Sequence, residues 1–570
     1  MIINIKTTID AATGRTKADL LLKNGSVFNV FTAEWMAVDL AIADGMIIGW
    51  GDYDAENIID CSGKYITPGF WDTHVHIESS TLNPVEFAKT ILPFGTTTII
   101  CDPHEIANVS GLDGVEYMLN STAGIPLTTY VMLPSCVPAS VFEASAHTLT
   151  AADLQKLIDH PRVLGLGEFM NYPGVQQADN EVLAKLELAK NKIVDGHAPQ
   201  EHGKLLNAYL CGGVRTEHEC VSAGEAREKL EKGMYIQIRE GTFCHNLQAL
   251  LPLINDYNLR RCLFCTDDRS PHQIIVDGHI NSIMAQAVAM GLPPEQALII
   301  ATLNAADCYR LARQGALAPG YIADVLILDD LKTFKPDTVI KNGDIVVRSG
   351  KLTATITHSR AGSNLMNTVN IAPLSPAQLN VAATQPLAKV IEVIPFQVCT
   401  KEILVDLPVI DGLFQPDLSL DVAKIVAVES HRATSSVAAG FLRGLGIKKG
   451  AIAQSIAHDA HNIIALGISD SEIIHAVNAL AAQQGGIVVV ENGEVIASLP
   501  LPIAGLMSDK SANEIIAATT LVENAAYSLG IISEFNPFIS LSFMSLSVIP
   551  ELKLTVNGLF DTTKFLFTHV

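Results

Sequence analysis

Short apolar segments alternate with helix-like segments through the middle of the chain, from about residue 67 to residue 315. A short apolar run bounded by turn residues predicts a buried strand, while Glu181–Lys192 and Ala223–Lys232 have the polar and apolar mixture of an exposed helix. Eight strands that alternate with helices over about 250 residues are typical of a (β/α)8 barrel. The predicted strands are Tyr65–Trp71, Thr97–Cys101, Thr129–Leu133, Val163–Gly167, Ile193–Asp195, Val214–Thr216, Tyr235–Ile238 and Arg261–Cys265.

The segments on either side of this region have the pattern of strands joined by tight turns. Leu20–Gly25 ends in Asn-Gly and Ala41–Ile48 turns at Asp-Gly, and both dipeptides are typical of β-hairpins. Similar patterns return at Ala323–Leu328 and Val339–Asp344. One small β-sandwich domain made from both segments, with the barrel inserted into it, is the economical interpretation. Its predicted parts are residues 1–66 and 316–375, and the TIM-like barrel takes residues 67–315.

A third region follows the second β-rich segment. Residues 354–385 are rich in Thr, Ala, Ser and Asn, a composition that suits a linker. Beyond it, the apolar strands Lys424–Val428 and Gly486–Val490 flank a helix-like segment, Asp470–Gln484. We predict a separate C-terminal α/β domain over residues 376–570, so the whole chain is of the α/β class.

Composition and charge exclude several classes of protein. The 570 residues carry a net charge of −22, with 48% hydrophobic and 17% charged residues. This balance is typical of a globular chain, and the acidic excess argues against a nucleic-acid partner, whose phosphates need a basic face. Met1–Lys6 has no signal-peptide pattern and we find no apolar run long enough to span a membrane. The scattered cysteines, including the lone CxxC pair Cys262 and Cys265, suit a reduced cytoplasmic protein.

Histidines and acids follow several predicted strands at the point where each strand ends. His74 and His76 are two residues apart, so in an extended segment both imidazoles point the same way and can bind one divalent ion. A His-x-His pair alone is a weak signal. The carboxyl ends of barrel strands meet at one rim, where the chemistry of barrel enzymes lies. Imidazoles and carboxylates gathered there suit one or two ions of Zn, Mn or Fe. The predicted ligands are His74, His76, Glu168, His197, His218 and Asp267.

His76 also fits part of a second kind of metal site. His76-Ile77-Glu78 matches the His-x-Glu half of the zinc signature of nucleoside and nucleic-acid deaminases. The other half, Pro-Cys-x-x-Cys, is missing, because the segment Pro134–Pro138 holds a single cysteine. That zinc fold is therefore excluded.

The segment Pro68–His76 resembles the first-strand motif of the amidohydrolase superfamily. Further segments resemble the adenine deaminases more narrowly, and they extend through the barrel into the C-terminal region. They are His76–Ser80, Gly95–Thr98, Asp102–Val109, Met132–Ala139, Gly165–Met170, Asp195–Pro199, Ile238–Gly241, Cys265–Arg269, Ala301–Ala306 and Ser455–Asn462.

This resemblance implies hydrolysis of adenine to hypoxanthine and ammonia, a purine salvage reaction. It also implies two divalent metals per subunit, with Mn²⁺ or Fe²⁺ favoured over Zn²⁺. Many superfamily members bridge two metals with a carboxylated lysine on the fourth strand. Here that position holds Glu168, which can bridge two ions without CO₂. The expected partner is the small molecule adenine, with neither nucleic acid nor membrane, and a homodimer is expected because superfamily enzymes are often oligomers.

Deamination needs acids that move protons near the metals. We assign Asp267 to accept the proton of the attacking water and to pass it to the departing amine. Ring nitrogen N1 also gains a proton, and Glu78, Glu105 and Glu240 are unranked candidates for its donor. Each of these glutamates could instead be a salt-bridge partner, since Arg239 and Arg269 are near in sequence.

Four residues are predicted to contact the substrate: His104, Ser135, Cys136 and Arg239. His104 could equally be an extra metal ligand or a residue that caps a helix. The turn that contains Ser135 and Cys136 could present backbone groups to a purine edge, or it could be a proline-framed turn without a ligand.

Three C-terminal histidines stay open. His458 and His461 lie on one side of the chain if their segment is helical. They and His431 could cover the barrel mouth, touch the metals or be ordinary interface residues.

Two other functions are weighed against adenine deamination. One is hydrolysis of a cyclic amide or an N-acetyl sugar, which the missing strand-four lysine and the Pro134–Pro138 segment disfavour. The other is a catalytically silent metal-binding scaffold, which the complete set of strand-end ligands disfavours.

Overall fold

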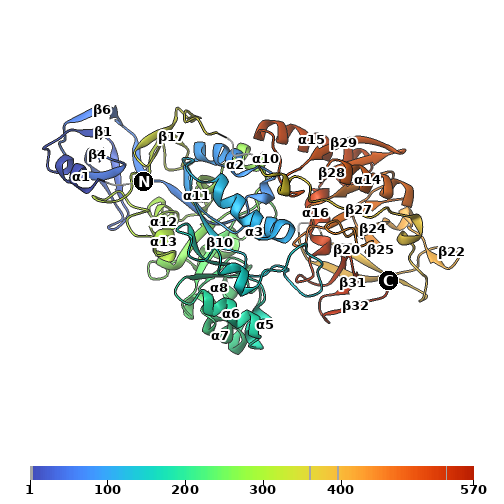
Figure 1. Cartoon of the computed structure of the whole chain (residues 1–570). Coiled ribbons are helices and arrows are strands. Elements are labelled where there is room, and N and C mark those ends of the chain that lie inside the picture. Colours follow the sequence, from blue (N-terminus) through green and yellow to red (C-terminus); the bar gives the residue numbers. More distant parts are fainter. Residues whose placement is uncertain (1–3, 358–360, 395–396, 535) are drawn as a thin grey trace.

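The computed structural model describes residues 4–357, 361–394, 397–534 and 536–570. A small β region, a central barrel and a C-terminal region with a large sheet follow one another across the molecule (Figure 1). Residues 1–3 of the N-terminal segment and residues 358–360 of the predicted linker lie outside the described residues.

Parallel strands form the central barrel. Two sheets, in the orders β12-β11-β10-β9-β8 and β13-β14-β15, meet on both sides, because β15 lies beside β8 and β13 beside β12. Val75 and Asp267 form a parallel bridge across one of these seams. The predicted (β/α)8 barrel is therefore confirmed. Its strands are β8 (Phe70–Val75), β9 (Thr96–Cys101), β10 (Thr128–Leu133), β11 (Val163–Phe169), β12 (Ile193–Gly196), β13 (Thr216–Glu217), β14 (Tyr235–Arg239) and β15 (Cys262–Cys265).

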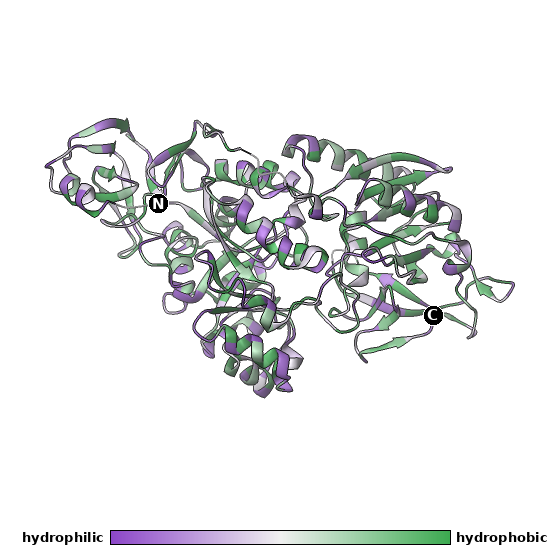
Figure 2. Cartoon of the chain, in the orientation of Figure 1, coloured by the Kyte–Doolittle hydropathy of each residue, from purple (hydrophilic) through white to green (hydrophobic). Residues whose placement is uncertain are grey.

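Helices surround the barrel because each has an apolar side to bury. In α11 (Ile280–Ala289), Ile280, Ile283, Met284 and Ala287 are buried at spacings of one, three and four residues. Figure 2 shows hydrophobic strands inside and mixed colouring on the outer helices. The other helices of this region are α2 (Pro84–Ile91), α3 (His104–Ser121), α4 (Ala151–Leu154), α5 (Tyr172–Gln176), α6 (Asn180–Leu188), α7 (Gly203–Cys211), α8 (Ala223–Glu231), α9 (Leu247–Leu250), α10 (Pro271–Asp277), α12 (Pro294–Ile300) and α13 (Leu303–Cys308).

The predicted strand Tyr65–Trp71 is two strands that belong to different sheets, and this corrects the sequence-based expectation. β7 (Tyr65–Pro68) pairs with β16 (Val325–Leu328) in the small β region, while β8 begins the barrel. Gly69 lies at the junction, where its N–H donates to the carbonyl of Asp324. A Cβ at this position would lie 2.1 Å from Thr97 Oγ1, so the chain passes too close to β9 for a larger residue.

Two sheets make up the small β region. One has the order β5-β4-β1-β6, and the other, β19-β18-β17-β16-β7-β2-β3, takes strands from both sides of the barrel sequence. Leu22 and Ile42 of the first sheet share a core with Ile66 and Val325 of the second. The domain boundaries at 66, 315 and 375 stay predictions. The strands are β1 (Ala18–Lys23), β2 (Ser26–Asn29), β3 (Glu34–Ala37), β4 (Leu40–Ala43), β5 (Met46–Trp50), β6 (Ala55–Asp60), β17 (Pro336–Lys341), β18 (Asp344–Arg348) and β19 (Lys351–Leu352).

The C-terminal region contains a mixed, largely antiparallel sheet in the order β21-β20-β25-β24-β27-β26-β28-β29. Helix α14 (Asp470–Ala482) covers one face through Ile473, Val477 and Leu480. Helices α15 (Ala512–Ser528) and α16 (Pro537–Ser542) lie on the side that meets the barrel (Figure 1). The sheet strands are β20 (Ala388–Val393), β21 (Thr400–Val405), β24 (Val422–Val428), β25 (Val437–Arg443), β26 (Ala451–Gln454), β27 (Ile463–Gly467), β28 (Gly486–Glu491) and β29 (Glu494–Pro500).

Smaller elements complete the chain. Helix α1 (Ile5–Ala12) precedes β1, and a short hairpin joins β22 (Val409–Ile410) to β23 (Leu413–Phe414). A final sheet contains β30 (Leu552–Thr555), β31 (Gly558–Asp561) and β32 (Leu566–Thr568). Among the described residues, no helix has the length and apolar character needed to cross a membrane.

Candidate metal centre

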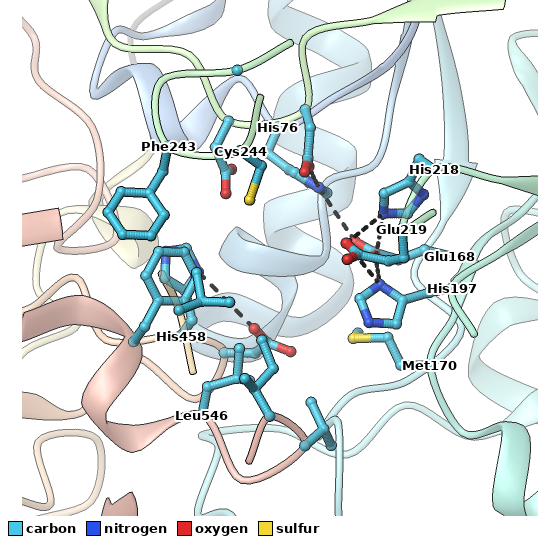
Figure 3. Close-up of a pocket in the computed structure, with 18 of the residues that line it drawn as sticks. His76, Glu168, Met170, His197, His218, Glu219, Phe243, Cys244, His458 and Leu546 are labelled. Carbon is cyan, nitrogen blue, oxygen red and sulfur yellow. Dashed lines mark hydrogen bonds and ion pairs between the residues drawn. The ribbon is translucent and has the colours of Figure 1, made fainter. Parts of the chain in front are cut away.

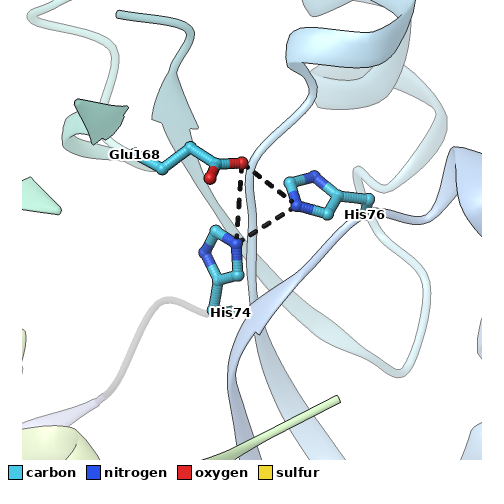
Figure 4. Close-up of side chains that lie close together, drawn as sticks. All are labelled: His74, His76 and Glu168. Atoms are coloured by element: carbon cyan, nitrogen blue, oxygen red, sulfur yellow. Dashed lines mark hydrogen bonds and ion pairs between the residues drawn. The ribbon is translucent and has the colours of Figure 1, made fainter. Parts of the chain in front are cut away.

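His74 and His76 lie at the carboxyl end of β8 and point toward the same space (Figure 4). Their Nε2 atoms are 3.1 Å apart and both rings are buried. His76 Nδ1 lies 2.9 Å from the carbonyl of Asp102, so this ring nitrogen carries the hydrogen and Nε2 keeps its lone pair. The predicted histidine pair therefore has the geometry of two ligands on one side of a metal site.

Glu168, near the end of β11, has its two carboxylate oxygens facing different histidines. Oε1 lies 3.3 Å from His76 Nε2 and 3.8 Å from His74 Nε2. Oε2 lies 2.6 Å from His197 Nδ1 and 3.3 Å from His218 Nε2. A carboxylate with one oxygen toward each group has the geometry needed to bridge two ions.

Asp267 follows β15 and completes the side of the site that holds His74 and His76. Its Oδ1 lies 3.1 Å from His76 Nε2 and 3.7 Å from His74 Nε2. The backbone is tied to β8, since Asp267 N–H donates to the His74 carbonyl and His76 N–H donates to the Asp267 carbonyl. Asp267 has a φ of 58°, a left-handed conformation that aspartate tolerates better than most residues.

The backbone near Glu168 is held by a buried carboxylate that sequence reasoning did not select. Asp102, just after β9, accepts the Glu168 N–H at 2.8 Å through Oδ2. A Cβ on Gly167 would lie 2.1 Å from that oxygen, so glycine is what allows Asp102 this close. Asp102 also supplies the carbonyl next to His76, and it thereby orients residues on two strands.

Charges in the cluster are set by burial and by neighbours. Burial would raise the pKa of Glu168, but His197, His218 and His76 hold that pKa well below its usual range. The pKa of Asp267 is likewise held well below its usual range, against burial, by Arg239 and His76. Burial and the nearby His218 and His76 lower the pKa of His74. Metal binding requires ionised carboxylates and neutral imidazoles. The two carboxylates and His74 meet this condition, whereas nearby carboxylates, Glu168 among them, raise the pKa of His76 and His218 against burial, so these two rings must release a proton when they bind an ion.

The donor set fits divalent metals. Three groups of side chains each bring their ligand N and O atoms within 4.8 Å of one another. The groups are His74, His76 and Glu168; His74, His218 and Asp267; and Glu168, His197 and His218. Buried polar atoms that converge in this way need a compensating charge or hydrogen between them, and a divalent cation can supply that charge. Imidazole and carboxylate donors together suit Mn, Fe and Zn.

Glu219 and Arg239 are linked to the cluster. Arg239 Nη1 lies 2.6 Å from Asp267 Oδ2, and Nη2 lies 2.9 Å from Glu219 Oε2. Glu219 Oε1 is also 3.3 Å from His218 Nε2. Arg239 also lines the cavity described below. Because its guanidinium binds the carboxylates of Glu219 and Asp267, it orients Asp267 in this structure. The predicted contact between Arg239 and the substrate stays a prediction. Glu219 follows His218 in sequence, and that adjacency was the signal that could have revealed it.

A buried lysine joins the two strands that carry His197 and His218. Lys229 Nζ, on α8, lies 3.0 Å from Glu217 Oε2, 2.8 Å from Glu225 Oε1 and 2.8 Å from the carbonyl of Ala198. The side chains of Lys229 and Glu217 are 0% exposed. Because Glu217 precedes His218 and Ala198 follows His197, this ion cluster fixes both ligand segments.

Lys229→Met should therefore destabilise the protein strongly. It leaves Glu217 buried without its cation, and removing one partner of a buried ion pair costs about 3–5 kcal/mol in the free energy of unfolding. Urea denaturation measures the loss. Lys232→Met is the matched control, because Lys232 pairs with Glu228 near the surface and such pairs contribute less than about 1 kcal/mol. Equal losses in the two variants would contradict the buried-cluster interpretation.

Only one of the three glutamates proposed as donors to N1 lines the cavity at the metal centre, and that residue is Glu105. Glu78 is buried behind it, where Oε1 accepts the Ile106 N–H and burial raises the pKa of Glu78 to about 7. Glu240 is turned toward His245, whose Nδ1 lies 2.6 Å away. Neither Glu78 nor Glu240 is among the described residues that line the cavity, so the structure does not bring these two predicted donors to it.

The predicted substrate contacts divide in the same way. His104 lines the cavity, and its Nδ1 lies 3.3 Å from Glu168 Oε1. Ser135 and Cys136 are buried beneath the site and are not among the described lining residues. Ser135 Oγ donates to the Glu168 carbonyl at 2.6 Å, and the Cys136 thiol accepts the N–H of Asn171. The structure thus gives the Ser135–Cys136 turn a supporting position under Glu168.

The C-terminal region closes the cavity over the metal centre. It contributes His458 and Asp459 and an apolar wall, while the barrel contributes five of the six predicted ligands, all but His74 (Figure 3). His458 and His461 lie in a turn after β26, so the helical alternative considered for them is wrong. His431 is buried elsewhere, with Nε2 2.7 Å from the Ala460 carbonyl. The apolar wall consists of Val398, Phe543, Leu546, Val548 and Ile549.

Comparison with known proteins identifies the family of the chain. A model of the amidohydrolase family matches residues 65–346, and a model of the adenine deaminase C-terminal domain matches residues 397–566. The chain is 46% identical over 563 residues to adenine deaminase 2 of Carboxydothermus hydrogenoformans, covering 98% of each chain. It is 44% identical over 566 residues to adenine deaminase of Clostridium acetobutylicum, covering 99% of each chain. The chain belongs to the adenine deaminase family.

The predicted resemblance to adenine deaminases is therefore confirmed, as is assignment to the amidohydrolases. The adenine deaminase C-terminal domain covers His458, Asp459 and the apolar wall, so this domain takes part in the cavity. Sequence reasoning did not select two further cavity acids, the half-buried Asp268 and the buried Asp459.

Proposed function

We propose that the chain catalyses the hydrolytic deamination of adenine to hypoxanthine and ammonia, and so acts on a C–N bond of a cyclic amidine. The observation that carries this proposal is the position of Glu168 between two groups of histidines, in a chain of the adenine deaminase family. The adenine deaminase C-terminal domain also favours this reaction over hydrolysis of a cyclic amide or an N-acetyl sugar. The ordered ligand set speaks against a silent scaffold.

We assign two divalent ions to the cluster, with Mn²⁺ or Fe²⁺ preferred to Zn²⁺. His74, His76 and Asp267 would hold one ion, His197 and His218 the other, and Glu168 would bridge them. Such ions lower the pKa of a bound water toward 7 and so supply hydroxide at neutral pH.

The side chains around the cavity have separate tasks in this proposal. Asp267 accepts a proton from the attacking water and returns it to the amine that leaves C6. Arg239 holds the second oxygen of Asp267, at 2.6 Å, and so fixes the direction in which this carboxylate receives the proton. The apolar wall with Phe543 and Leu546 excludes water and packs against the flat faces of a purine.

Metal removal and replacement test the proposed function. Protein stripped with a chelator should release no ammonia from adenine, and Mn²⁺ or Fe²⁺ should restore the activity better than Zn²⁺. Adenosine and guanine serve as comparison substrates in the same ammonia assay. Metal-loaded protein that leaves adenine untouched, or stripped protein that keeps full activity, would contradict the proposal.

Two further properties are proposed. A homodimer rests on the oligomers common in the superfamily, and a cytoplasmic location rests on the reduced state expected for the cysteines. All ten cysteines are free thiols in the structure, which supports a reducing compartment. Light scattering on purified protein and fractionation of cells test these two properties.

A further inference from the structure

A C-terminal turn reaches across the domain boundary to a barrel glutamate. Glu105 is near the start of α3 on the barrel, and His458 and His461 lie between β26 and β27. His458 Nδ1 lies 2.8 Å from Glu105 Oε1, and His461 Nε2 contacts Oε2 of the same carboxylate. All three side chains are buried. Both oxygens of Glu105 are thus in contact with imidazoles of the C-terminal region.

The hydrogen positions in this trio follow from its backbone contact. The N–H of Ala457 donates to His461 Nδ1 at 3.2 Å, so that ring nitrogen carries no hydrogen. His461 Nε2 therefore has the hydrogen and donates it to Glu105. A metal ion would need a lone pair at that same Nε2 atom. The trio is accordingly a hydrogen-bonded carboxylate and not a third metal site, although its spacing alone would suit a metal.

His458 is held so that its second nitrogen is left for a ligand. Its Nδ1 donates to Glu105, and its ring stacks on Phe543 with centroids 4.6 Å apart and planes inclined by 15°. Within the described part of the chain, His458 Nε2 has no hydrogen-bond partner. This atom is not fully enclosed by protein, so a ligand can reach it. His458 lines the cavity at the metal centre and also a neighbouring cavity beside Phe538 and Ser542, and Nε2 is the ring nitrogen left free for a ligand.

The position of His458 in the cavity suits contact with a substrate. Figure 3 shows His458 across the cavity from Glu168, His197 and His218, so a molecule bound between them would have the C-terminal domain on one side and the predicted ligands on the other. The guanidinium of Arg239 is engaged by Glu219, Asp267 and Asn246. Burial raises the pKa of the Cys244 thiol to about 12, and a thiol is a weak donor. His458 is the better placed donor on this side.

We propose that His458 contacts the purine and donates its Nε2 hydrogen to ring nitrogen N1, with Glu105 as the positioning residue that holds the imidazole. This inference rests on the proposed function. It resolves the choice among Glu78, Glu105 and Glu240 by making the donor a histidine of the C-terminal domain. The arrangement, a carboxylate behind an imidazole that faces the substrate, is the one by which a carboxylate fixes the orientation of a catalytic histidine.

Charge at His458 agrees with this role. Burial favours the neutral ring, but Glu105 overcomes that effect and raises the pKa of His458 to about 9. Asp268 and Asp459 act in the same direction. The ring is therefore protonated at neutral pH and has a hydrogen to give.

The proton and electron balance is complete with these groups. As the oxygen of water bonds to C6, the electron pair of the C6–N1 double bond moves to N1, which takes the hydrogen of His458 Nε2. Asp267 takes one proton of the attacking water and passes it to the amine, the C6–amine bond breaks, and ammonia leaves. The remaining hydroxyl proton is lost to solvent as the C6 carbonyl forms, and solvent returns a proton to His458. Hypoxanthine keeps the hydrogen on N1.

His458→Asn tests the assignment. The asparagine amide can replace Nδ1 toward Glu105 but has no atom at the place of Nε2. We expect kcat for adenine to fall about 10²- to 10⁴-fold, the usual contribution of a general acid. Metal content and melting temperature should stay at the wild-type values. His475→Asn, on an exposed position of α14, is the matched control and should leave kcat unchanged.

Binding of deaza analogues separates substrate contact from a structural role. Wild-type protein should bind 1-deazaadenine about 10- to 100-fold more weakly than 3-deazaadenine, because only the first lacks N1 and a hydrogen bond from a charged donor is lost. In His458→Asn this difference should vanish. His458→Gln, whose amide reaches the place of Nε2, should recover the difference in binding without recovering kcat.

Three outcomes would overturn the inference. They are a kcat of His458→Asn within twofold of an active wild type, loss of metal from that variant, or persistence of the 1-deaza difference in it. If His458→Asn does not fold, wild-type protein that binds both deaza analogues equally overturns it as well. Failure of wild-type protein to release ammonia would instead reject the proposed function on which this inference rests.

Discussion

The Glu168→Gln variant is expected to lose more than 100-fold in metal affinity and, with it, nearly all ammonia release from adenine. Glu168 is the residue whose two oxygens face the two histidine groups, at 3.3 Å from His76 and 2.6 Å from His197. A neutral amide offers one oxygen and one N–H₂ group, so it cannot ligate on both sides. Replacing residues that merely support a ligand already costs about 10- to 100-fold in affinity or activity, and a bridging ligand should cost more.

Metal analysis after dialysis against a defined free-metal concentration measures this loss, together with kcat/KM for adenine. Glu187→Gln is the matched control, because Glu187 is exposed on α6 of the same barrel and pairs with Lys190. It should bind metal and turn over adenine as wild type does. A Glu168→Gln protein that keeps both metals and its activity would show that Glu168 is not the bridge.

Asp267→Asn is expected to lower kcat by about 10²- to 10⁴-fold, the range in which a general base or acid contributes. Asparagine accepts the left-handed backbone at this position, where φ is 58°, so the fold should persist. One of its two side-chain atoms becomes an N–H₂ group, which can neither receive the proton of water nor accept from Arg239. The variant is therefore expected to lose proton transfer while it keeps the fold.

Steady-state kinetics with adenine and metal analysis should be measured on the same preparations of Asp267→Asn. Asp277→Asn, an exposed carboxylate at the end of α10, serves as control. Activity of Asp267→Asn within threefold of wild type would contradict a proton-transfer role. A variant that loses its metal completely would assign Asp267 to metal binding alone.

The barrel and its rim could be predicted because the signals are local. Each strand is a short apolar run, and the next residues are those that reach the rim, so His74, Glu168 and Asp267 could be found without knowing the contacts. The split between β7 and β8 could not be predicted in this way. The residues of β7 and β8 form one apolar segment in the sequence. The two strands divide at Gly69, which Thr97 of another strand approaches closely.

The remaining features of the site depend on contacts between residues far apart in sequence. Glu105 and His458 are 353 positions apart, and neither neighbourhood shows that the two side chains meet. Arg239 was expected at the substrate because it is near the predicted rim. Its position between Glu219 and Asp267 follows from the spacing of β13, β14 and β15 around the barrel. Such pairings arise only when the strands have been assembled.

The pairing of β7 with β16 also sets the order in which the chain can fold as it is made. Tyr65 lies opposite Leu328, so roughly 260 residues must be translated after β7 before its partner exists. At about 5–20 residues per second, this wait lasts on the order of 13–50 seconds on the ribosome. Until then β7 has a free edge on that side, and unpaired edges bind other chains. The nascent N-terminal region should accordingly need chaperone protection until residue 328 has emerged.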